Sequence, residues 1–161
     1  MDHLTASNIM ARSEATLPPD MDIYDAIRRL LRGKLTGAPV VDGDGVLLGM
    51  LTERDCLKVV VAGELDGWPG GKVSDYMSRP AKSIGPQATL SDLVHLFLTR
   101  PYRKLPVVDE SGHVIGQVSR RDALTAFESA RDNPRLFGSR EEPAADGSGV
   151  DSAMRLARHR K

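Results

Sequence analysis

Apolar and polar positions along this chain follow one arrangement that occurs twice. A segment with apolar residues at helical spacing leads to an apolar run that begins with proline, an acidic glycine turn, a second apolar run and another helical segment. Pro39 and Pro106 begin the two proline-led runs and lie 67 positions apart. An ungapped register over about fifty residues indicates two tandem copies of one unit. Residues identical at this offset include Met10 and Met77, Asp42 and Asp109, Gly45 and Gly112, Gly49 and Gly116, Arg54 and Arg121, and Asp55 and Asp122.

The same order of elements is predicted for each copy. A short extended segment at 15–17 or 82–84 comes first, and proline or glycine stops it. Strands at 39–41 and 106–108 are joined by tight turns to strands at 46–51 and 114–118. The helix between the extended segment and the first of these strands is predicted from Ile23, Ala26, Ile27, Leu30 and Leu31 in copy one, and from Leu90, Leu93, Val94, Phe97 and Leu98 in copy two. The apolar positions of the last helix include Leu57, Val60 and Val61 in copy one, and Leu124 and Phe127 in copy two.

The predicted fold class is α+β, with α/β-like features: two pseudo-symmetric β-α-β-β-α repeats packed sheet to sheet, with helices outside. A unit of about 55 residues buries too little surface to be more than marginally stable alone, and pairing two copies overcomes this. The predicted boundaries are 5–62 for repeat one, 63–71 for a linker, 72–131 for repeat two and 132–161 for a flexible tail with a basic end. Trp68 lies in the linker, where we favour a plug over the core edge above a contact with another subunit.

Composition argues against several classes of function. Lys and Arg together number 22, as do Asp and Glu, so no overall charge directs the chain to nucleic acid or to an acidic membrane. Cys56 is the only cysteine, and neither a secretory signal nor a membrane-length apolar run is visible, so we expect a cytoplasmic protein without a membrane partner. The four histidines lack metal-ligand spacing, and no nucleophile or phosphate-loop motif is present. We therefore expect no metal site, no catalytic residues and no enzymatic activity.

A motif of the form Gly-x-x-[Ser/Thr]-x-x-Asp closes the second apolar run of each copy. It places Thr52 and Asp55 in copy one, and Ser119 and Asp122 in copy two, where a strand gives way to a helix. Free backbone N–H groups at a helix start favour a phosphate, and an Asp one turn along can accept hydrogen bonds from a ribose diol. The spacing also fits a capping box, in which the hydroxyl caps a backbone N–H and the acid reaches back. Spacing alone favours the capping box.

Both copies resemble CBS domains, the repeat named after cystathionine-β-synthase, and the tandem pair resembles a Bateman module. The resemblance is carried by PVVD (39–42) with GMLTERD (49–55), and by LPVVD (105–109) with GQVSRRD (116–122). VSDYM (73–77) also looks like the lead-in of the family. The resemblance extends from about Thr5 to Ala130, and with no catalytic domain attached the chain is similar to stand-alone CBS-pair proteins.

The resemblance implies that the motif residues bind an adenosine-containing ligand. It assigns the two Asp side chains, Asp55 and Asp122, to ribose hydroxyls, and it assigns Thr52 and Ser119 to phosphate. Two intact motifs in a ligand-binding repeat reverse the preference reached from spacing, so we favour ligand binding over a purely structural cap. The candidate contacts to the base are Thr16, Val40, Ser83 and Val107.

Copy two carries more positive charge where a phosphate would lie. Arg103 and Lys104 precede its proline-led strand, where copy one has Thr36 and Gly37. The resemblance supports a basic residue here, since many nucleotide-binding family members carry one. We expect the cleft of copy two to be the stronger site, the alternative being that these are ordinary exposed cations. Its candidate ligand-binding residues are Arg103, Lys104, Ser119, Arg120, Arg121 and Asp122.

The function predicted from these patterns is a regulatory sensor. It binds AMP, ADP, ATP or S-adenosylmethionine in clefts between the repeats and couples occupancy to conformation or to partner binding. We expect no tightly bound cofactor, and the resemblance implies a homodimer and a protein target that the sequence does not identify. The alternative is a ligand-free dimerisation or interaction module. Nucleic-acid contact by the basic tail, with Arg155, Arg158, Arg160 and Lys161, comes a distant third.

Overall fold

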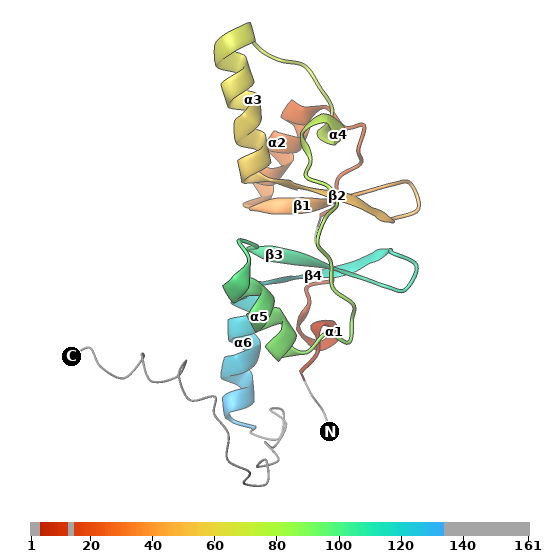
Figure 1. Cartoon of the computed structure of the whole chain (residues 1–161), viewed down its shortest axis with the longest axis vertical. Helices are drawn as coiled ribbons and strands as arrows, with labels where there is room; N and C mark the ends of the chain where they lie inside the picture. The colour runs from red at the N-terminus through yellow and green to blue at the C-terminus, as the bar shows by residue number, and fades with distance from the viewer. Residues whose placement is uncertain (1–3, 13–14, 134–161) are drawn as a thin grey trace, which may run out of the picture.

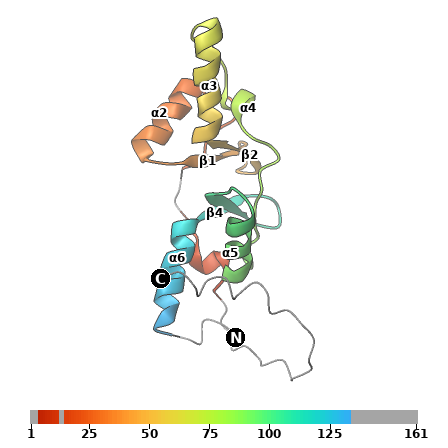
Figure 2. The ribbon, with the colours of Figure 1, turned by 60° about the vertical axis from the view of Figure 1, so that its left-hand side comes forward.

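Two hairpin sheets face each other at the centre of the molecule, and helices cover their outer sides (Figures 1 and 2). The computed structural model describes residues 4–12 and 15–133; the basic end of the predicted tail lies outside these residues. Copy one contains α2 (Ile23–Gly33), β1 (Gly37–Val41), β2 (Leu47–Thr52) and α3 (Glu53–Asp66). Copy two contains α5 (Leu90–Thr99), β3 (Lys104–Val108), β4 (Val114–Ser119) and α6 (Arg120–Arg131). The predicted α+β class with paired sheets is confirmed.

Each sheet is an antiparallel hairpin, and the two hairpins have the same register. Pro39 lies opposite Met50, and Pro106 lies opposite Gln117. The extended segments predicted at 15–17 and 82–84 are reduced to single parallel bridges, from Leu17 to Val40 and from Ile84 to Val107. The following Pro18 and Gly85-Pro86 account for the short pairing, because proline has no N–H to extend a ladder.

The helices begin at side-chain caps. Asp22 accepts hydrogen bonds from the N–H groups of Tyr24 and Asp25 at the start of α2, and Thr89 forms a capping box with Asp92 at the start of α5. These caps satisfy N–H groups that the first helical turn leaves without partners. The predicted apolar faces of these helices supply buried residues: Ile23, Ala26 and Leu30 from α2, and Leu90, Leu93 and Phe97 from α5.

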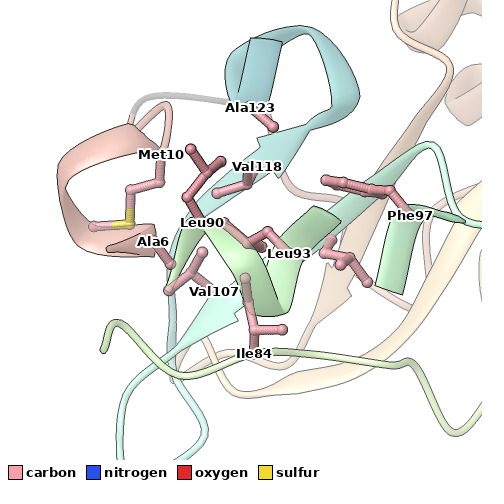
Figure 3. Packing of buried hydrophobic residues seen from close by; sticks show 10 residues of the cluster. Ala6, Met10, Ile84, Leu90, Leu93, Phe97, Val107, Val118 and Ala123 are labelled. Carbon is pink, nitrogen blue, oxygen red and sulfur yellow. The ribbon is translucent and has the colours of Figure 1, made fainter. Parts of the chain in front are cut away.

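The segments that lead into the two copies exchange places. Helix α1 (Ala6–Ile9) precedes copy one in sequence, yet Ala6 and Met10 are buried in the core of copy two (Figure 3). Helix α4 (Val73–Tyr76) precedes copy two, yet Val73 and Met77 are buried in the core of copy one. Each core is therefore completed by a segment that lies next to the other copy in the chain.

One glycine in β2 and one in β4 make room for the exchanged methionines. A Cβ placed on Gly116 would lie 2.5 Å from Met10 Sδ and 3.0 Å from the carbonyl oxygen of Ala11. A Cβ on Gly49 would lie 2.8 Å from both Met77 Sδ and the carbonyl oxygen of Ser78. Backbone atoms close the space on one side, so neither position can take a larger residue without moving the lead-in segment.

Backbone hydrogen bonds also join the two hairpins at their turns. The N–H of Leu47 donates to the carbonyl of Gly112, and the N–H of Val114 donates to the carbonyl of Gly45, both at 3.0 Å. Both glycines have positive φ, 86° for Gly45 and 85° for Gly112, so the turns use a conformation that L side chains rarely adopt. The two turns therefore form a second connection between the copies, away from the helices.

Two sets of apolar residues lie at the surface. Leu57, Val60 and Val61 of α3 are 62%, 57% and 57% exposed, and Leu124 and Phe127 of α6 are also exposed. Trp68 is 91% exposed and meets the ring of Tyr24 edge-on, so the interpretation of Trp68 as a plug over the core is wrong. Apolar periodicity places a residue on a face of a helix without showing whether anything in the same chain covers that face.

We predict that Gly116→Ala and Gly49→Ala each destabilise the protein by about 1–3 kcal/mol, because the new methyl group meets a methionine sulfur and a backbone carbonyl. Gly43→Ala is the matched control, because a Cβ there would meet nothing within 4 Å. Urea unfolding followed by circular dichroism measures the three free energies. Equal stability of Gly116→Ala and Gly43→Ala would contradict the close packing of Met10 against β4.

Candidate functional site

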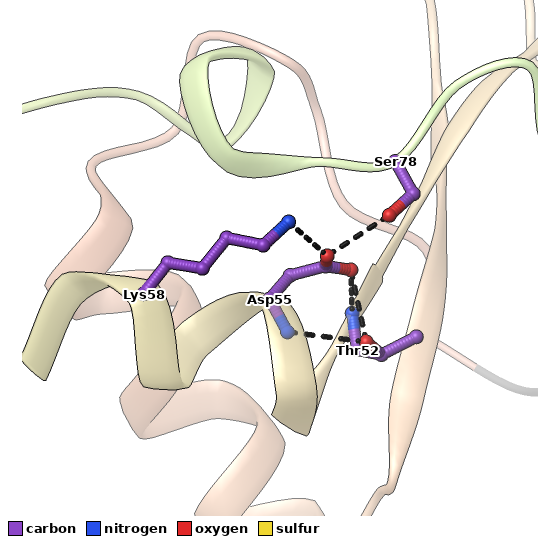
Figure 4. A network of polar contacts seen from close by, with 4 residues as sticks. All are labelled: Thr52, Asp55, Lys58 and Ser78. Atoms are coloured by element: carbon purple, nitrogen blue, oxygen red, sulfur yellow. Dashed lines mark hydrogen bonds and ion pairs between the residues drawn. The ribbon is translucent and has the colours of Figure 1, made fainter. Parts of the chain in front are cut away.

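Both Gly-x-x-[Ser/Thr]-x-x-Asp motifs form capping boxes at a junction between strand and helix. In copy one, Asp55 Oδ2 accepts hydrogen bonds from Thr52 N at 3.0 Å and Thr52 Oγ1 at 2.9 Å (Figure 4). In copy two, Asp122 Oδ2 accepts from Ser119 N and Ser119 Oγ, both at 2.7 Å. In each box the Asp N–H donates to the hydroxyl oxygen. The capping interpretation of the spacing is confirmed, and it occupies only one carboxylate oxygen of each Asp.

The second oxygen of Asp55 is also occupied. Asp55 Oδ1 accepts hydrogen bonds from Lys58 Nζ and Ser78 Oγ, both at 2.9 Å (Figure 4). The Asp55 residue is only 3% exposed. Burial raises the pKa of the carboxyl, but hydrogen bonds from Lys58, Thr52 and Ser78 outweigh burial and hold the pKa below its ordinary value. Asp55 is therefore a satisfied internal carboxylate.

Copy two lacks both of these additional partners. The positions that match Lys58 and Ser78 hold Thr125 and Ala11, neither of which can donate in the same way. Within residues 4–12 and 15–133, no side chain hydrogen-bonds to Oδ1 of Asp122. The half-buried Asp122 therefore keeps one acceptor oxygen for another molecule.

The cations predicted for copy two gather around the start of α6. Lys104 lies directly opposite Ser119 in the ladder of β3 and β4. Arg120 Nε donates to the carbonyl of Tyr102 at 2.8 Å, and Arg120 N donates to the carbonyl of Arg103 at 3.3 Å. Arg121 is exposed in the first turn of the helix. The structure thus places the backbone of the four predicted basic residues next to the helix terminus, where backbone N–H groups already favour an anion.

The predicted base contacts divide into two pairs. The side chains of Val40 and Val107 are fully buried in the cores of copies one and two, so their side chains do not face the space between the sheets. Thr16 and Ser83 are half-buried and directly precede the bridge residues Leu17 and Ile84. Among the four, Thr16 and Ser83 keep side chains that solvent can reach.

Three residues at the sites were not predicted. Lys58 lies three residues after Asp55 on the same helix, so the i, i+3 spacing of opposite charges could have indicated it. Ser78 is 23 residues from Asp55 in the chain, and it reaches the carboxylate only because α4 packs in copy one. Gln117 is buried within the apolar run of β4, where the matched residue of copy one is Met50.

The described residues contain neither a metal-ligand cluster nor a membrane-length apolar helix. Residues 4–12 and 15–133 contain no group of three or more His, Cys, Asp or Glu side chains placed to hold a metal ion. Over the same residues, no helix has both the length and the apolar character needed to cross a membrane.

We predict that Asp55→Asn destabilises the protein by about 1–3 kcal/mol near neutral pH, because a buried, charge-assisted hydrogen-bond network loses its anion. The pKa of Asp55 is lowered from 3.8 by folding, so the stabilisation is complete above that value and disappears as pH falls through the lower native pKa. Unfolding free energies measured from pH 7 to pH 2.5 should therefore converge for the variant and the wild type at the acid end.

The control for this prediction is Asp25→Asn, because Asp25 pairs with Arg28 on the exposed surface and should change stability by less than about 1 kcal/mol. A difference between wild type and Asp55→Asn that stays constant down to pH 2.5 would contradict an ionised, hydrogen-bonded Asp55.

Comparisons with known proteins agree with the duplicated architecture. The family model of the CBS domain matches residues 6–62 and 73–129. The structure of CBSX2 from Arabidopsis thaliana in complex with AMP is 26% identical, covers 80% of this chain and 98% of that chain, and has a TM-score of 0.70. The CBS-domain protein ATU1752 from Agrobacterium tumefaciens is 28% identical over 76% of this chain and 92% of its own, with a TM-score of 0.66.

Curated relatives include both short proteins and enzymes. The protein MJ1426 of Methanocaldococcus jannaschii is 29% identical over 67% of this chain and 82% of its own length. The inosine-5'-monophosphate dehydrogenase of Halalkalibacterium halodurans is 30% identical over 88% of this chain, which spans only 28% of the enzyme. The similarity to the dehydrogenase is thus confined to a part of that enzyme. Because two family matches together cover well over half of the sequence, the chain belongs to the CBS-domain family and contains two CBS domains in tandem.

Proposed function

We propose that this protein is a regulatory module that binds an adenosine-containing ligand, with copy two as the principal site. The observation that carries the proposal is the difference between the two acidic residues. Asp55 is saturated by Lys58 and Ser78, whereas Asp122 retains an oxygen with no partner in the described residues. A ribose diol donates two hydrogen bonds and needs such an acceptor. The binding of AMP by the related CBSX2 supports an adenosine-type ligand.

Charge at the start of α6 supports the same assignment. Ser119 lies at the N-terminus of a helix of 12 residues, with Lys104 opposite and Arg120 next to it. Copy one has Glu53 in the first turn of α3, where copy two has Arg120, so a phosphate would meet a negative charge there. The proposed ligands are AMP, ADP, ATP and S-adenosylmethionine, the last of which would use its own carboxylate near these cations.

Occupancy of copy two can be transmitted because β4 carries both the motif and the contact with the exchanged segment. Gly116 packs against Met10, and Gln117 forms backbone hydrogen bonds with Ala11 on the same strand that ends in Ser119. If β4 has two positions and a ligand binds one of them better, the ligand shifts the equilibrium toward that position. Helix α1 moves with the strand because it packs against it. Neither copy is proposed to catalyse a reaction.

We predict that isothermal titration with the four ligands detects binding, and that Asp122→Ala weakens the tightest of them by at least about tenfold, because a charge-assisted hydrogen bond contributes ~1.5–3 kcal/mol. Asp55→Ala is the matched control and should leave that affinity within about threefold, since its carboxylate is already occupied. The reverse ranking of the two variants would contradict the assignment of copy two.

A second candidate function, self-association, is favoured by the exposed apolar side chains. Leu57, Val60, Val61 and Leu65 of α3 and Leu124 of α6 are all more than half exposed. Apolar surface of this kind on the outer helices is typical of protein interfaces. We infer that a second copy of this chain covers these residues, which agrees with the homodimer that the family resemblance implies. The interaction module and the ligand sensor are compatible, because the proposed site uses the start of α6, whereas most of these exposed apolar residues lie along α3.

We predict that Val60→Glu combined with Leu124→Glu converts a dimer to a monomer, because each new glutamate would place an unpaired charge in an apolar interface. Light scattering after size exclusion measures the mass, and Lys82→Glu on an exposed loop is the control that should remain dimeric. A wild-type protein that is monomeric at all concentrations would exclude the second candidate function.

A further inference from the structure

Gln117 holds a buried acceptor with no partner. The residue is 2% exposed, and its side-chain Oε1 is fully buried without a hydrogen bond from any described residue. Buried polar atoms are hydrogen-bonded in the great majority of native proteins, so an unpaired oxygen calls for an explanation such as a bound molecule. Gln117 occupies a variable position of the Gly-x-x-[Ser/Thr]-x-x-Asp motif and is not one of the residues predicted to bind the ligand.

The side chain of Gln117 lies on the same face of β4 as Ser119. Its neighbour Val118 points into the core of copy two, and side chains alternate along a strand. Gln117 and Ser119 therefore both point away from that core, toward the facing sheet, with Cα atoms about 6.6 Å apart along the strand. A ligand held at Ser119 and Asp122 by its sugar and phosphate would have its base within reach of a glutamine at this distance.

Both edges of the strand are fixed at Gln117. Pro106 lies opposite it in β3, and on the other edge the Gln117 N–H donates to Ala11 at 3.0 Å while its carbonyl accepts from Ala11 at 2.9 Å. Pro106 is itself fully buried and presents no polar side-chain atom to the amide. The backbone of Gln117 is thus held at both edges of the strand, and a precisely placed polar group of this kind is how binding sites fix the orientation of a ligand.

Copy one has no equivalent group. The matched position holds Met50, which faces Pro39 in the same register and pairs with Ser78 as Gln117 pairs with Ala11. The duplicated unit therefore accepts an apolar side chain at this place, and the packing does not require a glutamine. The amide occurs in the copy whose Asp122 also keeps an unoccupied oxygen.

We propose that the side-chain amide of Gln117 hydrogen-bonds to the base of the bound ligand and makes the site selective for adenine. The inference depends on the proposed nucleotide site in copy two. A glutamine amide presents one acceptor and one donor side by side. The edge of adenine presents a complementary amino donor and ring-nitrogen acceptor, a pairing that glutamine also makes when proteins recognise adenine in nucleic acids. The pairing in nucleic acids uses N6 and N7 of adenine; at this edge hypoxanthine presents two acceptors, its carbonyl oxygen and N7, so no group there donates to Oε1.

The test compares AMP with IMP, which differ at this edge of the base. We expect wild-type protein to bind AMP at least about tenfold more tightly than IMP in calorimetric titration. Gln117→Met introduces the residue found at the matched position of copy one, and should lower AMP affinity about tenfold while leaving IMP affinity within about twofold. The variant should unfold at a temperature no lower than wild type, because it removes an unpaired buried oxygen.

A second measurement needs no variant. The side-chain amide resonances of Gln117 in ¹⁵N-labelled wild-type protein should shift on saturation with AMP, because the amide gains a hydrogen-bond partner. Equal affinity of wild type for AMP and IMP, an unchanged preference in Gln117→Met, or unmoved amide resonances with AMP bound would each overturn the role of Gln117 and leave the proposed function intact. Absence of binding to all adenosine ligands would instead overturn the proposed function and the inference with it.

Discussion

The packing of two methionines against two glycines holds the molecule together as one unit. Met10 enters the core of copy two beside Gly116, and Met77 enters the core of copy one beside Gly49. Neither copy has a complete core without the segment that the other copy's lead-in supplies. Because small units bury little apolar surface and are only marginally stable alone, the exchange makes the stability of each half depend on the other. The facing sheets and the outer helices are positioned around this contact.

The repeated pattern was enough to predict the four longer helices and the two hairpins, because strands, turns and helix starts depend on local residues, but the short helices α1 and α4 were not predicted. It did not predict the exchange, since an offset between two copies says nothing about which core a lead-in enters. The helices α2 and α5 bury most of their predicted apolar face, while Leu57 and Val60 of α3 remain exposed although their spacing is equally regular. Periodicity defines a face, and only three-dimensional packing shows what covers it.

The candidate site could be predicted from its motif, but the difference between the sites of the two copies could be predicted only in part. The greater positive charge of copy two is visible in Arg103 and Lys104. The occupation of Asp55 is not visible, because one of its partners, Ser78, arrives from a distant segment through the exchange. The capping box and a ligand site are compatible alternatives, because the box uses one carboxylate oxygen and leaves the other to a different partner. What that other oxygen contacts is therefore the property that distinguishes the two copies.

The exchanged lead-in segments have the arrangement of a swapped homodimer joined into one chain. If two separate, identical units each gave a lead-in helix to the other, the result would be a swapped homodimer with two equivalent cores. Joining the end of one unit to the start of the other, through a linker such as residues 63–71, preserves every contact of that dimer within a single chain. Once the halves share one gene, they no longer have to be identical. A symmetric dimer of identical chains must have the same residue in both halves. The single chain can instead have Lys58 and Ser78 in one half only, and Gln117 in the other half only.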